Sequence, residues 1–480
     1  MDDTGKWLPV AEIAEKVNAG ELKAVDLVER SLKIIEEKKE YDAIIATTAE
    51  RARERAKQID ERVKSHEKVG RLAGVPFIAK DNYLAFGAET TAASNILKGF
   101  NAPYQSTAIE RLEAEGAILV AKANLDAFAH GSSTENSDFM VTKNPHDLTR
   151  VVGGSSGGPA AAVILGMAPF ALGSDTGGSI RLPASWGGCV GYKPTYGLVS
   201  RSGVVAMASS TDCMGPMTCT VDDTALVLDV MAGKDDLDGT TIDRDPAGYT
   251  LNGARLDLRG KKIGVIKEYM GEGLQPGVRA VIEAAIQKVK TAGADVREVS
   301  LPSLPMALAV YYIVCPAEVS SNLGRYDGQR FGYSYPDAVN LEESYTKSRG
   351  VGFGKEAKRR IMIGTYVLSS GYYDAYYKRA QTVRTKLINE FNDAFKDVDF
   401  LVGPTAPMTA FKIGENVNDP LQMYLADIMT VGVSLVGSPA IVVPAGTSEG
   451  LPVGLQLMTA QRQDRSLLEL AKATEELLHA

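Results

Sequence analysis

The sequence predicts an α/β fold, in which a mixed central β-sheet is covered by helices on both faces. Two observations predict it: amphipathic helical segments alternate with short apolar segments along the whole chain, and neither a repeat nor a linker divides its 480 residues. Apolar residues make up 45% and charged residues 23%, which is ordinary for a globular protein. We therefore expect one large domain over residues 1–480.

The N-terminal elements follow from composition. The first 65 residues are rich in alanine, glutamate, lysine and isoleucine, a helical pattern with breaks near Asn18 and at 39–41. The segments GVPFIAKDN (74–82) and GAILVAK (116–122) then predict two buried strands. The first of these strands ends in the polar residues Lys80, Asp81 and Asn82, at the sheet edge where α/β enzymes place their sites.

The C-terminal half continues the alternation. A helix is expected over residues 221–233, with Gly233 as its stop signal. Another is expected from Gly277 to Lys290, where six apolar residues share one helical face: Val278, Val281, Ile282, Ala285, Ile286 and Val289. Gly293 ends it. A final helix begins near Asp464. Strands are expected at 261–269, 295–301, 399–404, 440–446 and 451–458.

Charge and cysteine content exclude several classes of protein. The net charge of −8 argues against a chain that grips nucleic acid by itself. No apolar run approaches the roughly 20 residues of a membrane span, and the N-terminus does not resemble a signal peptide. The four cysteines form no CxxC motif. We therefore expect a cytoplasmic protein with reduced thiols.

Histidine is scarce, and this limits the chemistry. The chain has four histidines, no HExxH motif and no His/Cys cluster at ligand spacing, so we expect neither a metal nor a cofactor. The sequence GGSSG matches the nucleophile elbow of α/β-hydrolases, but that mechanism needs a later histidine, and only His479 follows. Residues 350–356 lack the spacing of a phosphate-binding loop.

The densest signal lies between residues 153 and 197, where glycine-rich segments flank two serines, Ser155 and Ser179. Glycines beside a serine permit close backbone approach, so that several amide N–H groups can point into one cavity, as an oxyanion hole requires. Apolar runs such as residues 160–172 interrupt this region, which indicates a packed structure rather than a linker. Without histidine, a desolvated lysine can activate a serine, and Lys80 is the candidate base.

These motifs resemble the amidase signature family. The resemblance rests on GGSSGG (153–158), GSDTGGSIR (173–181), GYKPTYG (191–197) and the strand-end KDN at 80–82. It implies a catalytic core at about 70–220 and a Ser–cis-Ser–Lys triad, with Ser179 as the nucleophile, Ser155 as the bridging serine after a cis peptide, and Lys80 as the base. It further implies that the amides of Thr176, Gly177, Gly178 and Ser179 hold the oxyanion.

Residues 357–384, 402–407 and 419–430 extend the resemblance, over nearly the whole chain, to the A subunits of glutamyl-tRNA(Gln) amidotransferases. In that subfamily an arginine and an aspartate hold the α-carboxylate and α-amino groups of glutamine. By motif these roles fall on Arg360 and Asp427, whose charges suit a zwitterion. The resemblance implies B and C partner subunits that hold the tRNA, while this chain releases ammonia from glutamine.

The sequence departs from the subfamily at several neighbours of these motifs. Ala127 and His130 replace an acid and a methionine in the loop DAFAHGSSTE, which we expect to line the acyl pocket, with His130 either packed or contacting the substrate. The sequence also differs from the subfamily pattern at Leu182, Trp186 and Ser202. The alternative hypothesis is a stand-alone amidase that hydrolyses small aliphatic or aryl amides. It predicts that Arg360 and Asp427 lie away from Ser179.

Overall fold

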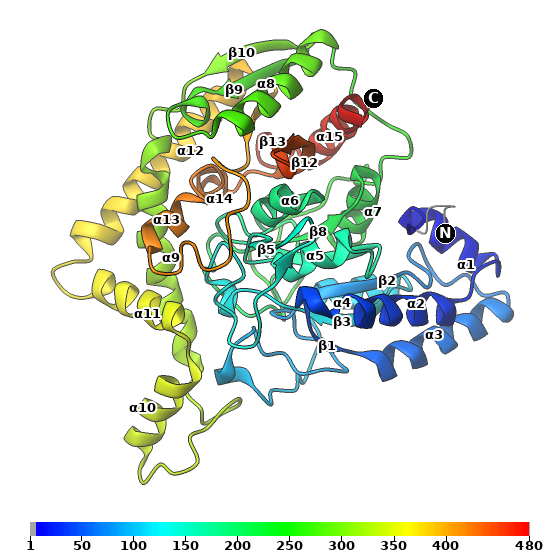
Figure 1. Cartoon of the computed structure of the whole chain (residues 1–480), viewed down its shortest axis with the longest axis vertical. Helices are drawn as coiled ribbons and strands as arrows, with labels where there is room; N and C mark the ends of the chain where they lie inside the picture. Colours follow the sequence, from blue (N-terminus) through cyan, green and yellow to red (C-terminus); the bar gives the residue numbers. More distant parts are fainter. Residues whose placement is uncertain (1–5, 480) are drawn as a thin grey trace.

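The computed structural model describes residues 6–479, so the expected domain limits at 1–5 and 480 lie outside the described residues. An 11-stranded sheet runs through it in the order β1-β3-β2-β6-β8-β7-β12-β13-β11-β9-β10 (Figure 1). The sheet is mixed, as expected: β2 is parallel to β3 and β6, whereas β8, β7, β12 and β13 pair antiparallel. Its strands are β1 Ile44–Thr47, β2 Pro76–Lys80, β3 Ile118–Ala123, β6 Phe170–Asp175, β7 Val190–Lys193, β8 Cys213–Thr218, β9 Lys262–Ile266, β10 Asp295–Val299, β11 Phe400–Pro404, β12 Ala440–Ser448 and β13 Leu451–Met458.

Helices cover both faces of the sheet, because alternate side chains of a strand face opposite sides. On β13, Leu455 and Leu457 line a small cavity together with side chains of α8 and α15, whereas Gly454 and Gln456 form hydrogen bonds with α6. The small hairpin β4–β5 (Lys143–Asn144 and Asp147–Val151) stands apart from the sheet. The helices are α1 Val10–Asn18, α2 Ala24–Glu37, α3 Ala49–Lys64, α4 Thr107–Ala114, α5 Gly157–Ile164, α6 Arg181–Gly187, α7 Val221–Met231, α8 Pro276–Thr291, α9 Ala307–Asn322, α10 Leu341–Gly352, α11 Lys355–Leu368, α12 Arg379–Asp397, α13 Pro420–Leu425, α14 Val431–Val436 and α15 Asp464–His479.

A separate group of helices forms around α9, which packs against α11, α12 and α14. Helix α11 lies so close to α9 that a Cβ atom at Gly364 would overlap the carbonyl oxygen of Pro316. The helical stretch Leu304–Arg325 is long and apolar enough to cross a membrane by length and composition, with a mean hydropathy of 1.3, which the sequence analysis did not anticipate. Half of that window is buried against neighbouring elements, which is the ordinary environment of a core helix.

Most expected elements are confirmed, and the exceptions have physical causes. The helical N-terminal region also contains the edge strand β1, whose four residues, IIAT, are too few to show the period of a strand. The run at 160–172 divides into α5 and the start of β6, because Gly166 at φ +69° ends the helix. The strand expected at 261–269 ends at Ile266 and continues as a 3₁₀ turn.

Candidate active site

Lys80 lies at the C-terminal end of β2, at the sheet edge where the parallel strand β6 also ends. Its side chain is fully buried, and its Nζ atom donates to three serine hydroxyls: Ser155 Oγ at 2.7 Å, Ser174 Oγ at 2.9 Å and Ser156 Oγ at 3.0 Å. The nearest hydroxyl therefore belongs to the serine that the sequence analysis expected to bridge the base and the nucleophile.

The backbone brings Ser155 and Ser179 to one place. The peptide bond between Gly154 and Ser155 is cis, as the family resemblance implied. The next amide, of Ser156, donates to the carbonyl oxygen of Ser179 at 3.0 Å, which joins the two glycine-rich turns. Ser155 is fully buried and Ser179 is 7% exposed, so Ser179 is the more accessible hydroxyl.

The turn that carries Ser179 is held from both ends. Asp175 and Arg181 form a buried ion pair at 2.9 Å, and Asp175 also accepts from the Ile180 amide. Thr176 Oγ1 donates to Asp212 at 2.7 Å, and Thr430 Oγ1 donates to the Gly177 carbonyl at 2.6 Å. These contacts fix the turn while leaving the amides of residues 176–179 unused.

At two positions of this turn the neighbouring side chains leave room for glycine only. A Cβ atom at Gly178, where φ is +151°, would overlap the Thr430 side chain, and one at Gly177 would lie 2.7 Å from the Tyr311 ring. Within the part of the chain that the structure describes, no protein acceptor takes a hydrogen bond from the amides of residues 176–179. These amides are therefore available to a bound oxyanion.

Burial decides the protonation of the Lys80 amine. Removal from water lowers the pKa of Lys80 to about 7, and the carboxylates of Asp126, Asp175 and Asp212 only partly oppose this shift. Burial also raises the pKa of Asp126 to about 6, although the amides of Asn136 and Thr134 act against it. A substantial fraction of Lys80 is thus neutral near neutral pH, as a general base must be.

Arg360 and Asp427 are both buried, and they approach the same region from α11 and from the end of α13. Arg360 Nε donates to Glu356 at 2.9 Å, and its guanidinium lies over the rings of Tyr312 and Tyr424. Asp427 Oδ2 accepts from Ser132 Oγ at 2.5 Å and from the Tyr312 hydroxyl at 3.5 Å.

Two contacts connect this pair to the turn that carries Ser179. The sequence analysis assigned no role to Thr430, yet its hydroxyl bonds both the Asp427 and Gly177 carbonyls. Tyr311, beside the Arg360 partner Tyr312, lies against Gly177. A cavity of about 60 Å³ is lined by Ser132, Glu356, Arg360 and Tyr424 among others. Burial raises the pKa of Asp427 to about 7, with the Ser132 hydroxyl and Arg360 opposing the shift.

His130 is fully buried, and neither of its ring nitrogens has a hydrogen-bond partner among residues 6–479. Burial lowers the pKa of His130 well below its usual value, and the charge of Arg360 adds to this. The ring is therefore neutral. A buried imidazole with two unsatisfied nitrogens is unusual for a residue that only packs.

Several polar contacts of the site escaped the sequence analysis. Ser156 and Ser174 bond the Lys80 amine and stand in the same motifs as Ser155 and Ser179. The presence of two serines in each motif was the sequence feature that could have predicted these contacts. Lys122 is the penultimate residue of β3, beside the end of β2 that carries Lys80, and its buried amine pairs with Asp81 at 2.7 Å. Within residues 6–479, no three His, Cys, Asp or Glu side chains gather as metal ligands would.

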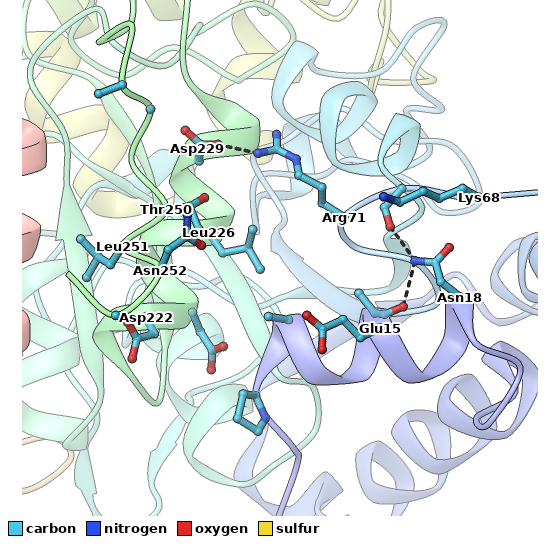
Figure 2. A pocket seen from close by; sticks show the side chains of 18 residues that line it. Glu15, Asn18, Lys68, Arg71, Asp222, Leu226, Asp229, Thr250, Leu251 and Asn252 are labelled. Atoms are coloured by element: carbon cyan, nitrogen blue, oxygen red, sulfur yellow. Dashed lines mark hydrogen bonds and ion pairs between the residues drawn. The ribbon is translucent and has the colours of Figure 1, made fainter.

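A larger cleft of about 640 Å³ lies between α1, α7 and the loop at 247–253, and Figure 2 shows its lining. None of the expected site residues lines it. Two of its polar side chains are engaged within its walls: Arg71 pairs with Asp229 at 2.5 Å, and Asn18 donates to backbone carbonyls. The chemistry therefore lies with the small cavity and the buried serines.

Comparison with known proteins agrees with this geometry. The family model described as Amidase matches residues 26–468. The chain belongs to the amidase family. It is 51% identical over 472 residues to the A subunit of the glutamyl-tRNA(Gln) amidotransferase of Symbiobacterium thermophilum, covering 98% of this chain and 96% of that protein. The corresponding protein of Caldanaerobacter subterraneus is also 51% identical, over 469 residues and with coverages of 98% and 96%.

Solved structures of this family include members with different substrates. The A subunit of the glutamyl-tRNA(Gln) amidotransferase from Thermotoga maritima is 40% identical, with a TM-score of 0.79 and coverage of 96% of this chain and 94% of that one. A bacterial aryl acylamidase of the amidase signature family is 26% identical, with a TM-score of 0.86 and coverages of 99% and 97%. The amidase fold and amide C–N chemistry are therefore shown, and the chain shares about half of its residues with the A subunits of two amidotransferases.

Proposed function

We propose that this chain is the glutamine-hydrolysing A subunit of a glutamyl-tRNA(Gln) amidotransferase. One observation carries the proposal: buried Arg360 and Asp427 lie together beside the turn of Ser179, linked to it through Tyr311 and Thr430. A small neutral amide offers neither a carboxylate nor an ammonium group to them. Glutamine offers both, at the opposite end from its side-chain amide.

In the proposed reaction, Ser179 attacks the side-chain amide carbon of glutamine. Its hydroxyl proton passes to Ser155 Oγ, while the proton of Ser155 passes to the neutral amine of Lys80. The 2.7 Å contact between Lys80 and Ser155 supports the second transfer. The charge that develops on the carbonyl oxygen is held by the amides of residues 176–179, which have no protein acceptor among the described residues.

The tetrahedral intermediate then collapses. The C–N bond breaks as Lys80 returns a proton through Ser155 to the leaving nitrogen, and ammonia departs from an acyl-enzyme. Water attacks this ester with the same base, which releases glutamate and restores Ser179. The buried, low-dielectric setting strengthens each of these electrostatic contacts.

The substrate contacts are assigned by charge. Arg360 binds the α-carboxylate and Asp427 the α-ammonium of glutamine. His130 precedes the cavity residue Gly131 and offers a neutral ring with two unsatisfied nitrogens. Bringing an ammonium group beside Asp427 also favours its ionised form. The pair that Arg360 already makes with Glu356 holds the guanidinium in place without filling the cavity beside it.

The remaining parts of the proposal concern the protein as a whole. We propose that residues 1–480 act as one domain that works with B and C subunits in the cytoplasm, and that those partners rather than this acidic chain hold the tRNA. The four cysteines are free thiols, as a reducing compartment would keep them.

The test is ammonia release from glutamine and from a panel of simple aliphatic and aryl amides, with and without added B and C subunits. We expect glutamine turnover that partners stimulate and little turnover of simple amides. Brisk hydrolysis of simple amides without partners would instead establish a stand-alone amidase. Ser179→Ala serves as the blank.

The variant Asp427→Asn distinguishes glutamine hydrolysis from the hydrolysis of simple amides within one protein. The variant loses the charge that faces an ammonium group, so kcat/KM for glutamine should fall about 100-fold. Its kcat/KM for any simple amide that the wild type accepts should change little, because such an amide makes no contact with Asp427. Equal losses on both substrates would contradict the assigned contact.

A further inference from the structure

Exposed large apolar side chains are concentrated in one part of the molecule. Of the 18 that the described residues contain, 11 lie between Val339 and Tyr376. Scattered exposed apolar residues are normal on any protein surface, but a concentrated patch marks an interaction site. Figure 1 shows α10, α11 and the turn after α11 at the margin of the molecule, away from the sheet.

The densest part of this region is a surface that we name the aromatic face, formed by Met362, Ile363, Tyr366, Tyr372 and Tyr376. Their side chains are 38–72% exposed, with Met362 the most exposed. Three of the rings pack together: the centroid of Tyr366 lies 4.3 Å from Tyr372 and 6.1 Å from Tyr376. Met362 and Ile363 precede Tyr366 by four and three residues, and so share its side of α11.

The aromatic face has the size and composition of an interface centre. At about 200 Å² for each side chain, these exposures amount to roughly 500 Å², against about 800 Å² that one partner contributes to a standard interface. Tyrosine and methionine are enriched at interface centres. Tyr373 and Leu368, 46% and 38% exposed, extend the apolar surface beside it.

The charge around the aromatic face restricts what can cover it. Residues 323–379, which we call the arm, contain ten lysines and arginines and six aspartates and glutamates, a net charge of +4 in a chain of −8. Lys358 and Arg359 are exposed and precede Met362 by four and three residues on α11, so they border the aromatic face as a basic rim. A second copy docked face to face would oppose two such rims, which is unfavourable. An acidic rim on a different protein would complement it.

The opposite side of α11 faces the substrate site. Arg360 is buried and Met362 is 72% exposed, although they are two residues apart on one helix. Gly364, four residues after Arg360, holds that inner side against α9. A protein seated on the outer side of α11 would therefore contact the helix that carries the carboxylate-binding arginine.

We propose that the aromatic face is the docking surface for one of the other subunits of the amidotransferase, whose complementary face is apolar with an acidic rim. This inference rests on the proposed function. RNA is the less suitable occupant despite the basic rim, because the tyrosine rings pack against one another at tilted angles and Met362 and Ile363 offer no stacking surface for bases.

The test measures binding of the full-length chain to purified B and C subunits of the same organism, by isothermal titration at low and moderate salt. The variant is Met362→Asp with Ile363→Asp, which places two acids in an apolar interface that faces an acidic rim. We expect affinity to fall about 100-fold or more. Met362→Lys, which adds the opposite charge, should weaken binding less than Met362→Asp.

Leu237→Asp is the matched control, because Leu237 is 77% exposed but lies outside the arm. It should bind as the wild type does. Each variant should keep the wild-type circular dichroism spectrum and Tm, so that a loss of binding reports the surface rather than the fold. Weaker binding at higher salt would support the charged rim.

The other outcomes overturn the proposal in distinguishable ways. Wild-type binding that the double variant leaves intact refutes the docking surface but not the proposed function. Failure of the wild-type chain to bind B and C subunits refutes both. A wild-type dimer that the double variant dissociates assigns the face to a second copy. A loss of tRNA binding, with B and C still bound, assigns it to RNA.

Discussion

The catalytic centre and the arm depart from the ordinary distribution of side chains in opposite directions. Around Ser179 the molecule buries charged and polar groups completely, among them Lys80, Asp175 and Arg181. In the arm it leaves apolar groups such as Met362 and Tyr366 in solvent. Both arrangements reduce the free energy of unfolding, since one desolvates charge and the other leaves apolar area exposed.

The difference shows how each kind of function is marked. Buried polar groups indicate chemistry, because a low-dielectric setting shifts pKa values and strengthens the contacts that stabilise a transition state. Exposed apolar groups indicate association, because their burial drives binding. A substitution should therefore change turnover in the first region and assembly in the second, and the predictions below test that separation.

The largest effect is expected at the nucleophile. Ser179→Ala removes the attacking oxygen, so kcat should fall by at least about 10⁴-fold while the fold persists. Steady-state ammonia release and a thermal melt measure the two quantities. Substantial residual turnover would mean that another hydroxyl attacks, and Ser155 would be the first to examine.

Two buried lysines at adjacent strand ends separate catalysis from stability. Lys122→Met strands the buried Asp81 carboxylate and should lower the free energy of unfolding by about 3–5 kcal/mol. Lys80→Met breaks hydrogen bonds to neutral serine hydroxyls and no direct ion pair, so it should lower the free energy of unfolding by less, while its activity falls nearly as far as that of Ser179→Ala. Denaturant unfolding compares them, and equal destabilisation would contradict this distinction.

The pH dependence should differ between substrates. Lys80 acts in its neutral form and its pKa is about 7, so kcat/KM for a simple amide should fall about tenfold for each pH unit below that value. For glutamine, Asp427 must also be ionised, and its pKa is likewise about 7. The acid limb should therefore be steeper for glutamine than for a simple amide, approaching about a hundredfold per unit. Parallel limbs would remove Asp427 from substrate binding.

The smallest effect is expected on the arm. Met362→Asp replaces a side chain that is 72% exposed, so the free energy of unfolding of the isolated chain should change by less than about 0.5 kcal/mol. Chemical denaturation of the two proteins gives the comparison. A loss of several kcal/mol would show that Met362 packs within the chain, which would make the arm an ordinary part of the core.

The sequence predicted the elements whose residues carry a strong period. Helix α8 begins at Pro276 and buries Val278, Ile282, Ala285 and Val289, as the apolar spacing indicated. Strand β8, CMGPMT, escaped because a glycine and a proline interrupt it, although all six of its residues are buried in the sheet. Tertiary pairing with β6 and β7 overrides the weak local preference.

The sequence predicted the site residues that stand in local motifs. It did not predict the contacts that form only when distant segments meet in the fold. Lys80, Ser155 and Ser179 stand in recognisable segments, and the structure brings their turns together. The links through Thr430 and Tyr311 join segments more than 100 residues apart, and no local pattern records such a contact. Likewise, the unsatisfied nitrogens of His130 depend on what surrounds the ring rather than on its neighbours in sequence.

The absence of a side chain at Gly364 sets how closely α11 packs against α9. Any larger residue at position 364 would collide with the Pro316 carbonyl. Such a substitution would push α11 away from α9, and Arg360, one turn earlier on α11, would move with it. With the proposed role of Arg360, affinity for a substrate carboxylate would thus depend on a position that touches no substrate. In evolution, a substitution at position 364 could therefore lower the affinity for glutamine without any change in Lys80, Ser155 or Ser179.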